Sequence, residues 1–463
     1  MRANLSSHDL KVLDHAHHFH PFTDHAHLGI DERRVISRAD GVWLWDTDGN
    51  RILDAMAGLW CVNVGHGRME IADSVRAQMG ELSYYNTFFK TSHLPVIELS
   101  ARLAEITPPH MNMTVYGSSG SDANDTVLRM ARTYWDLMGK SDKKIIISRK
   151  NAYHGSTVAG ASLGGMGGMH DQGDLPIAGI HHIDQPYWFG EGMFTDMSES
   201  EFGIWAAQEL DRAIEEIGED KIAAFIAEPI QGAGGVIIPP DSYWPEVRKI
   251  LDKRDILFVS DEVICGFGRT GEWFGCDYYG TTPDFMPIAK GLTSGYLPLS
   301  GVVISDRVAQ AFHDEKSGDF NHGYTYSGHP AACSAAIANI DIMKKEKLVE
   351  RVKTDIGPIL QKLWAELGNH DLVGEARMVG LLGALELVPD KSKLTKRFEN
   401  VGQVGTIARD HSFSNGMVMR AVRDSLIISP PLVLSEEEAV QLVTTAKKTL
   451  DDTWSSLKTA GLL

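Results

Sequence analysis

Residues 256–290 read ILFVSDEVICGFGRTGEWFGCDYYGTTPDFMPIAK. The stretch begins with a short apolar run, Ile256–Ser260, that leads directly into Asp261. Short runs rich in Ile and Val are typical of strands that are buried on both faces of a parallel sheet. Such sheets bind ligands at the carboxyl ends of their strands, where Asp261 would lie. A second apolar run then ends on Lys290, so the stretch predicts two ionisable side chains near one edge of a sheet.

The middle of the chain repeats this pattern. Short apolar runs predict three further strands, at Lys144–Ser148, Ile222–Ala227 and Gly301–Ser305. Amphipathic segments between them predict helices, among them Asp122–Met138 and Trp205–Ile217. Because strands and helices alternate, we expect an α/β fold in which helices cover a mostly parallel sheet.

The two ends of the chain follow other patterns. Residues 40–54 predict a hairpin, and a helical pattern starts at Glu70. The last part of the chain is richer in helical patterns, with short strands expected at Gly383–Leu387 and Leu426–Ile428. These patterns predict a second, smaller domain.

The composition is that of a globular protein with more than one domain: 463 residues, of which 43% are hydrophobic and 23% are charged. The net charge of −18, from 44 basic and 62 acidic residues, argues against binding to nucleic acid or to an anionic membrane. The four cysteines have no paired spacing, which favours free thiols. Without an apolar leader or a membrane-spanning run, we expect a cytoplasmic protein.

The first 30 residues are rich in histidine. Metal binding is one explanation, and a polar arm that packs against the body or a partner subunit is the other. No carboxylate or cysteine is evident at the spacing usual for a metal site, so we favour the polar arm and predict no metal. The histidines concerned are His15, His17, His18, His20, His25 and His27.

Three features of the central region belong to one chemistry. Lys290 ends an apolar run, and desolvation lowers the pKa of a lysine, as a Schiff-base lysine requires. Asp261 and Glu228 each follow a predicted strand. The small residues Ser119–Ser121 lead into a helix, whose first N–H groups can bind an anion. Each feature alone has a plainer explanation: an exposed lysine, a solvated strand end, a helix cap. Together they predict pyridoxal-phosphate catalysis, in which the carboxylate keeps the pyridine nitrogen protonated.

Residues 266–271 read GFGRTG and match the glycine pattern of dinucleotide-binding proteins. That pattern requires glycines that open a helix. The residues that follow, Glu272–Asp277, are a poor helix start, so we expect a structural loop here.

At this point the sequence resembles the class III aminotransferases, of the type called omega-amino acid or amine:pyruvate transaminases. The resemblance runs from about Phe22 to Pro431. Its motifs stand in family order: Ser119–Asn124, Tyr153–Gly155, Glu228-Pro229, Asp261–Val263 with Gly266–Gly271, Ala289–Gly291, and Thr325–Pro330.

The resemblance implies a fold-type I transferase with pyridoxal 5'-phosphate as cofactor and Lys290 as the catalytic residue. A large domain of residues 66–335 would stand beside a small α+β domain built from residues 1–65 and 336–463. The protein would be a homodimer with shared active sites, or a tetramer built from such dimers. Residues implied to contact or support the cofactor are Ser119, Gly120, Ser121, Tyr153, His154, Glu228, Asp261, Val263 and, from the partner subunit, the residue equivalent to Thr325.

The resemblance also bears on the substrates, an amine or omega-amino acid and a keto acid. Arg420 looks like the mobile arginine that pairs with the substrate carboxylate in related enzymes. Arg423 stands where the family more often has glycine; a surface role is the simpler reading, although a second cation for the carboxylate is the alternative. Relatives that use 2-oxoglutarate tend to have glutamate near Ala233, so alanine there favours the pyruvate/alanine pair. Aromatic residues expected to line the amine pocket are Phe22, Trp60, Phe88 and Tyr153.

Two other classes of protein compete with this prediction. An aminomutase, racemase or decarboxylase on the same fold would share Lys290 and Asp261, so these residues do not discriminate. Arg420 together with Ala233 favours transamination. A cofactor-binding regulatory module is the other alternative, but the net charge of −18 argues against a nucleic-acid partner.

Overall fold

The structure is a computed structural model that describes residues 5–315 and 317–463. Its largest sheet has seven strands in the order β4-β10-β9-β8-β7-β5-β6. β10 is antiparallel to both of its neighbours, whereas β9, β8, β7, β5 and β6 are parallel. The prediction of a mostly parallel α/β sheet is therefore confirmed. The strands are β4 (Met111–Gly117), β5 (Ile145–Arg149), β6 (Ile180–Ile183), β7 (Ile222–Ala227), β8 (Leu257–Ser260), β9 (Phe285–Ile288) and β10 (Ser300–Ser305).

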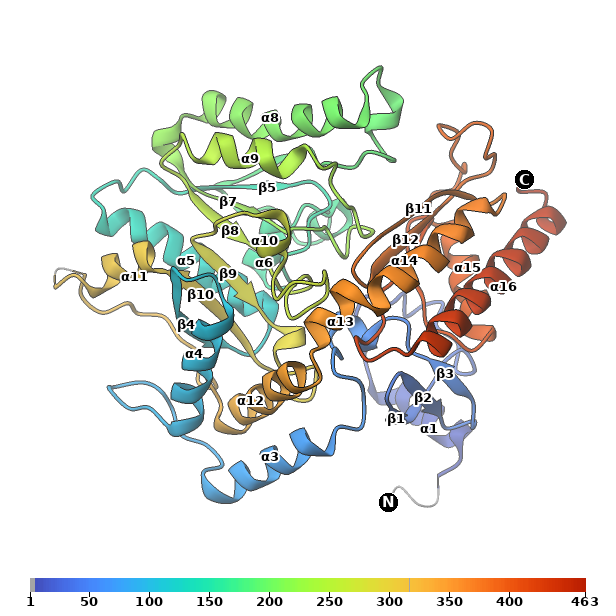
Figure 1. Ribbon diagram of the computed structural model, residues 1–463, viewed down its shortest axis with the longest axis horizontal. Coiled ribbons are helices and arrows are strands. Elements are labelled where there is room, and N and C mark those ends of the chain that lie inside the picture. The colour runs from blue at the N-terminus through green and yellow to red at the C-terminus, as the bar shows by residue number, and fades with distance from the viewer. Residues whose placement is uncertain (1–4, 316) are drawn as a thin grey trace.

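Helices cover both faces of this sheet (Figure 1). α8 (Glu199–Ile217) and α9 (Tyr243–Leu251) pack on one face, where Phe225 of β7 and Phe258 of β8 lie in the same hydrophobic cluster as residues of both helices. α5 (Gly120–Leu137) and α11 (Asp306–His313) pack on the other face. All residues of β7, β8, β9 and β10 are buried, as expected for strands covered on both sides.

Two smaller sheets are built from the ends of the chain. The first contains β1 (Ile36–Asp40), β2 (Trp43–Asp46) and β3 (Arg51–Leu53), so the predicted hairpin is confirmed and has one additional strand. The second has the order β11-β12-β14-β13 and contains both strands predicted near the C-terminus. Its strands are β11 (Val373–Val379), β12 (Leu382–Leu387), β13 (Arg420–Val422) and β14 (Ser425–Ile428).

The other helices complete the two parts of the molecule. α14 (Ile356–Glu366) and α16 (Glu436–Ala460) lie beside β11 and β12 on the right of Figure 1. None of the helices in residues 5–315 and 317–463 combines the length and the hydropathy needed to cross a bilayer. Their bounds are α1 Ser7–His17, α2 Ala57–Trp60, α3 Met69–Glu81, α4 Leu94–Ile106, α6 Val158–Leu163, α7 Gly167–His170, α10 Gly275–Tyr279, α12 Pro330–Lys345, α13 Leu348–Thr354, α14 Ile356–Glu366, α15 Gln403–Ser414 and α16 Glu436–Ala460.

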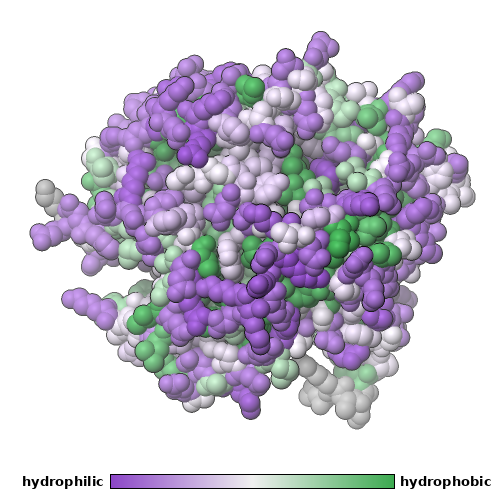
Figure 2. All heavy atoms as spheres, in the orientation of Figure 1, coloured by the Kyte–Doolittle hydropathy of each residue, from purple (hydrophilic) through white to green (hydrophobic). Residues whose placement is uncertain are grey.

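The surface drawn in Figure 2 is dominated by hydrophilic residues, with hydrophobic residues confined to small areas between them. This distribution agrees with the acidic composition of the chain, which has a net charge of −18. The four cysteines, Cys61, Cys265, Cys276 and Cys333, are free thiols, and all but Cys61 are buried.

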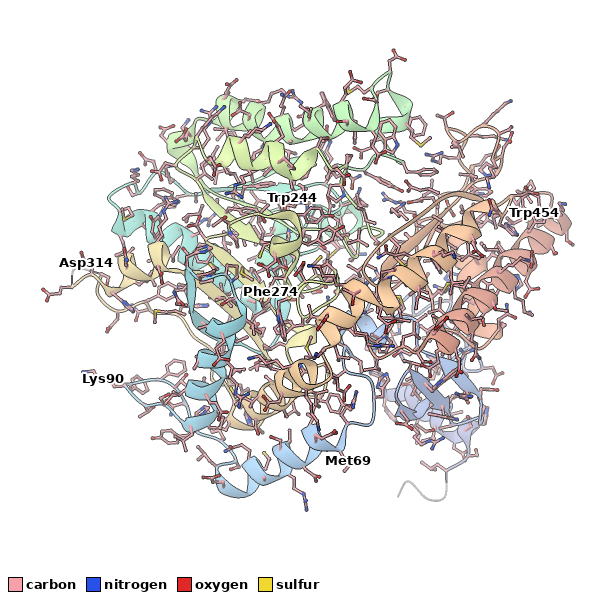
Figure 3. The ribbon with its side chains drawn as sticks, in the orientation of Figure 1. Met69, Lys90, Trp244, Phe274, Asp314 and Trp454 are labelled. Atoms are coloured by element: carbon pink, nitrogen blue, oxygen red, sulfur yellow. The ribbon has the colours of Figure 1, made fainter. Side chains whose placement is uncertain are left out.

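The glycine-rich residues 266–271 form the structural loop that was expected. Glu262 is buried and accepts hydrogen bonds from the backbone N–H groups of Gly275 (2.7 Å) and Cys276 (2.7 Å), at the start of α10. Burial raises the pKa of Glu262 to about 7. Phe267 packs edge-to-face against Phe274, which Figure 3 labels near the centre of the molecule. Because these glycines do not open a helix, the dinucleotide-binding alternative is wrong.

Candidate active site

Residues that follow β5, β7, β8 and β9 meet the start of α5 in a pocket of about 150 Å³. The strands β4, β5, β7, β8 and β9 present their carboxyl ends at the same edge of the sheet, and α5 begins there. This is the position at which parallel sheets bind ligands. The pocket is lined by Gly120, Ser121, Asn124, Tyr153, His154, Gly155, Glu228, Asp261, Val263, Ile264 and Lys290.

Lys290 lies two residues beyond the end of β9, in a backbone conformation that lysine rarely adopts, with φ of 44°. Strained φ values of this kind persist only where the surrounding structure enforces them, and they cluster at functional sites. Its Nζ lies 5.4 Å from the centre of the Trp60 ring. Burial disfavours the ammonium form and lowers the pKa of Lys290, although Cys61 and Asp261 oppose this shift. The amine is therefore primed to act as a nucleophile or a base.

Asp261 is fixed by three hydrogen bonds at the end of β8. Its Oδ2 accepts from Nδ2 of Asn124 (2.9 Å) and pairs with Nδ1 of His154 (2.7 Å), and its Oδ1 accepts from the N–H of Val263 (3.1 Å). Asp261 is 3% exposed and His154 is 1% exposed. A carboxylate oriented in this way within a buried site suits the pairing with a cationic ring nitrogen.

Glu228 supports the same wall of the pocket from the end of β7. Its carboxylate accepts from the backbone N–H groups of Tyr153 (3.1 Å) and Gly232 (2.9 Å). Burial raises the pKa of Glu228, and the nearby Asp261 adds to that rise, while His154 opposes it. Glu228 therefore ties the segment that carries Tyr153 to the loop that follows β7.

The junction between β4 and α5 is shaped by small residues. Ser119 caps α5, and its hydroxyl accepts from the N–H of Asp122 (3.3 Å). A Cβ on Gly120 would stand 3.0 Å from Val263, and a Cβ on Gly155, which has φ of 133°, would stand 2.7 Å from the backbone of Ser121. The glycines therefore keep open a space in front of the first N–H groups of α5, where an anion is favoured.

The residues that line the pocket match the groups of pyridoxal phosphate. The start of α5 supplies N–H groups for a phosphate, Asp261 supplies a carboxylate for the ring nitrogen, and Lys290 supplies an amine. Within the described residues, the buried His154 Nε2 and Asn124 Oδ1 have no hydrogen-bond partner, which indicates room for a further polar group.

A second group of predicted residues forms a wall around Trp60, which lies beside Lys290, and apart from Tyr153 these residues are not among those that line the pocket. Trp60 is 3% exposed and shares a hydrophobic cluster with Ala233 and Tyr153. The guanidinium of Arg420 lies 5.0 Å from the centre of the Trp60 ring, and burial lowers the pKa of Arg420. Phe22 is 76% exposed and meets Tyr153 edge-to-face at 6.4 Å between ring centres.

Arg423 follows β13 and is not among the residues that line the pocket. It is exposed, and its guanidinium donates to the carbonyl of Gly234 (3.3 Å). The surface interpretation of Arg423 agrees with this position.

Phe88 and Thr325 do not line this pocket. Phe88 lies against Gly323, where a Cβ would stand 3.0 Å from its ring, and the hydroxyl of Tyr84 donates to the carbonyl of Thr325 (2.6 Å). The loop that carries Phe88 also carries Lys90, which Figure 3 labels at the outer edge of the molecule. These two residues therefore lie together on a separate, exposed part of the chain.

Asn124 is a pocket residue that the sequence analysis left out of the site. It lies one turn after Gly120 in α5, so both residues face the same side of the helix. Besides Asp261, its Nδ2 donates to the carbonyl of His154 (2.8 Å). The helical spacing from Gly120 was the signal that could have identified it.

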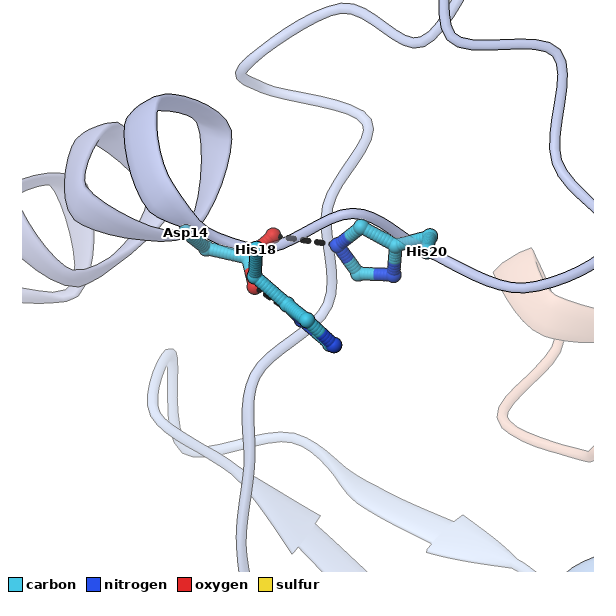
Figure 4. Close-up of side chains that lie close together, drawn as sticks. All are labelled: Asp14, His18 and His20. Atoms are coloured by element: carbon cyan, nitrogen blue, oxygen red, sulfur yellow. Dashed lines mark hydrogen bonds and ion pairs between the residues drawn. The ribbon is translucent and has the colours of Figure 1, made fainter.

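The histidine-rich arm contains a cluster that the sequence analysis did not expect (Figure 4). The carboxylate of Asp14 contacts Nδ1 of His18 (3.0 Å) and Nε2 of His20 (2.6 Å), close enough to share an ion, so the expectation that no carboxylate accompanies these histidines is wrong. The same carboxylate accepts from Nε of the buried Arg33 (2.9 Å). Since Arg33 already neutralises Asp14, these contacts fit a polar arm held by ion pairs.

Comparison with known proteins places this geometry in a family. The profile of the class-III aminotransferases matches residues 28–450. A putrescine–pyruvate aminotransferase of Pseudomonas aeruginosa is 56% identical over 450 residues, which cover 97% of each chain. The structure of the omega-transaminase from Pseudomonas jessenii in complex with PMP has a TM-score of 0.93 and 37% identity, covering 97% of this chain and 99% of that chain.

A thermostable (S)-enantioselective omega-transaminase from Thermomicrobium roseum is similar to the same extent. It has a TM-score of 0.92 and 39% identity, and the match covers 97% of this chain and 99% of that chain. The profile, the relatives and the pocket agree with one another. The chain belongs to the class-III aminotransferases, enzymes that use pyridoxal phosphate.

Proposed function

We propose that the protein is an omega-transaminase that moves an amino group from a primary amine or omega-amino acid to pyruvate. The observation that carries this proposal is the pocket in which Lys290 and Asp261 meet the start of α5, in a chain that is 56% identical to a putrescine–pyruvate aminotransferase. Putrescine, a short diamine, is therefore the first amine donor to test.

The residues that would hold the cofactor follow from the pocket. Gly120 and Ser121 would hold its phosphate at the start of α5, Asp261 would pair with its ring nitrogen, and Tyr153 and Val263 would contact its ring. His154 and Glu228 act through their hydrogen bonds to Asp261 and Tyr153. When bound, pyridoxal phosphate supplies an electron sink that weakens the C–H bond of the substrate carbon carrying nitrogen.

Lys290 has two tasks in this reaction. Its Nζ would hold the cofactor when no substrate amine is bound. As a free amine, Nζ takes the proton from the donor carbon that carries nitrogen in the first half-reaction, and it gives a proton to the keto-acid carbon in the second. Burial favours the neutral amine that removal of a proton requires. Because donor and acceptor use the same Nζ in turn, the kinetics are ping-pong.

The wall beside Lys290 accounts for the acceptor. Arg420 is the cation for the keto-acid carboxylate, and its guanidinium packs on the Trp60 ring. Ala233 leaves the arginine without a neighbouring carboxylate at that position. A small acceptor such as pyruvate matches this wall, while Phe22, Trp60 and Tyr153 offer apolar surface to the amine.

The wider organisation belongs to the same proposal. We place a large domain at residues 66–335 and a small domain at residues 1–65 and 336–463. Two copies pair in the cytoplasm, and Phe88 and Thr325 of each copy reach the active site of the other.

Product analysis tests this function. Purified holoenzyme is incubated with putrescine and pyruvate, and alanine is measured. Alanine formation that depends on both substrates is expected. If the enzyme forms glutamate from 2-oxoglutarate but no alanine from pyruvate, the proposal that pyruvate is the acceptor is contradicted. Release of CO₂ would indicate a decarboxylase, and a rearranged amine would indicate an aminomutase.

A further inference from the structure

The loop that follows β7, Gln231–Ile237, places Ala233 in the hydrophobic cluster that contains Trp60, and part of its backbone is strained. Val236 has φ of 51° and Gly235 has φ of 126°. A β-branched residue such as valine is a conformational outlier at positive φ. Such a conformation is energetically unfavourable and persists only where its surroundings hold it in place.

The side chain of Arg377, on β11, holds this strained segment. Its Nε donates to the carbonyl of Val236 (2.7 Å), and its Nη2 donates to the carbonyl of Gly235 (2.7 Å). The two carbonyls therefore belong to the two residues with positive φ. The planar guanidinium fixes both of them at once, which the single ammonium of a lysine cannot do in the same geometry.

A buried network fixes Arg377 in turn. Its Nη2 also donates to Glu386 of β12 (2.6 Å), which accepts further from the hydroxyls of Ser425 (2.5 Å) and Tyr187. Glu386 is 5% exposed. Burial alone would raise the pKa of Glu386, but Arg377 and the two hydroxyls hold it below its usual value, so the pair is ionised. Glu375 contacts the remaining nitrogen of Arg377.

The network joins the loop to the sheet that carries Arg420. Ser425 of β14 pairs with Glu386 of β12, and β14 pairs with β13, where Arg420 lies. The side chain of Val422 on β13 approaches the position of a Cβ on Gly235 to 3.9 Å. Ala233 on the loop shares a hydrophobic cluster with Trp60, and the guanidinium of Arg420 on the sheet lies over the Trp60 ring. The relative position of Ala233 and Arg420 therefore depends on how the loop and the sheet are joined.

We propose that Arg377 is a positioning residue for substrate binding. It holds the loop Gln231–Ile237 in its strained conformation and so keeps Ala233 in its position near Trp60 and Arg420. Arg377 contacts neither Lys290 nor Asp261 in any hydrogen bond or ion pair found among the described residues. We expect loosening of the Gly235–Val236 end of the loop to weaken substrate binding, while the hydrogen bond from Gly232 to Glu228 (2.9 Å) keeps the start of the loop on the wall of the cofactor site. This role rests on the proposed function.

The test compares Arg377→Lys with Arg132→Lys in steady-state kinetics of the holoenzyme with putrescine and pyruvate. Arg132 is a matched control because its guanidinium also donates to two backbone carbonyls, of Lys144 (3.0 Å) and Ala178 (3.4 Å), near the far end of α5. Arg377→Lys keeps the charge opposite Glu386. We expect it to raise both KM values about tenfold, the equivalent of about 1.4 kcal/mol, with kcat changed less than about twofold and the cofactor absorbance unchanged.

A second variant makes the test independent of the folding of Arg377→Lys. Gly235→Ala strains the loop at φ of 126° and leaves the side chain of Arg377 unaltered. No atom outside the neighbouring residues stands closer than 3.9 Å to the added Cβ. It should reproduce the rise in KM, while Arg132→Lys should not. Unchanged KM values in Arg377→Lys or, should that variant not fold, in Gly235→Ala would overturn the role of Arg377. A wild type without turnover would instead overturn the proposed function, and this role with it.

Discussion

At the residue scale, the burial of Lys290 has a measurable consequence for pH dependence. Burial lowers the pKa of its ammonium, so the neutral amine forms at lower pH than the value of about 10.4 for an unperturbed lysine. We expect an amine-selective reagent to modify Lys290 in the cofactor-free enzyme and so to block its reactivation by pyridoxal phosphate. The extent of this block should rise with pH, with a midpoint below that value. A midpoint at or above it would mean that Lys290 is not desolvated.

Asp261 gives a second prediction at this scale. Asp261→Asn removes the charge that pairs with the ring nitrogen, so we expect a loss of kcat of about 10²- to 10³-fold while the cofactor still binds. Asp284→Asn is the control, because Asp284 is a largely buried aspartate next to the amino end of β9, at the opposite edge of the sheet. Equal effects of the two substitutions on kcat would argue against a specific role for Asp261.

The sequence predicted the residue chemistry better than the residue contacts. Lys290, Asp261 and Glu228 could be found because each follows an apolar strand and carries a charge that burial makes costly. Asn124 and Arg377 could not be found in this way. Asn124 is neutral within a helix, and Arg377 acts on a loop more than 100 residues away in the chain, a pairing that only the tertiary structure brings about.

At the scale of elements, the junction of β4 with α5 depends on the glycines that face it. Gly155→Ala adds a Cβ 2.7 Å from the backbone of Ser121 at a φ of 133°, so the start of α5 must shift. We expect the affinity for pyridoxal phosphate to fall about tenfold or more, since strain of this kind costs about 1–3 kcal/mol. Titration of cofactor-free enzyme, followed by absorbance, measures the change.

Gly139→Ala is the matched control for that substitution. Gly139 lies just beyond the other end of α5 and also has a positive φ, of 72°. No atom lies within 4 Å of the Cβ that the substitution would add. Gly139→Ala should lower thermal stability without lowering the affinity for pyridoxal phosphate. Equal losses of affinity in both variants would show that the effect reflects general destabilisation.

The buried inner strands of the large sheet were easier to predict than its two edge strands, β4 and β6. β7 and β8 are short runs of mostly apolar residues, because a strand that is buried on both faces needs apolar side chains on both. β4 mixes exposed and buried residues, and β6 reads IHHI, so neither was expected as a strand. The start of α5 was placed two residues late because its first turn consists of small residues that serve the pocket rather than the helix.

At the scale of the whole molecule, the exposed aromatic loop near Phe88 predicts an interface. Phe89 is 91% exposed, and Phe88 and Thr325 lie apart from the pocket that family resemblance assigns to them. We expect sedimentation equilibrium to give a mass of at least twice 50.9 kDa. Phe89→Glu should shift the equilibrium toward monomer and reduce activity in parallel. A fully active monomer would contradict shared active sites.

The central claim is that Lys290 operates a pyridoxal-phosphate half-reaction with an amine and returns the amino group to pyruvate. The most direct measurement is the absorbance spectrum of the purified protein as putrescine and then pyruvate are added, in wild type and in Lys290→Ala. The account predicts a visible band that moves to shorter wavelength with the amine and returns with pyruvate, and no such cycle in the variant. A wild type that shows no visible band after reconstitution, or whose band returns with 2-oxoglutarate but not with pyruvate, would contradict it.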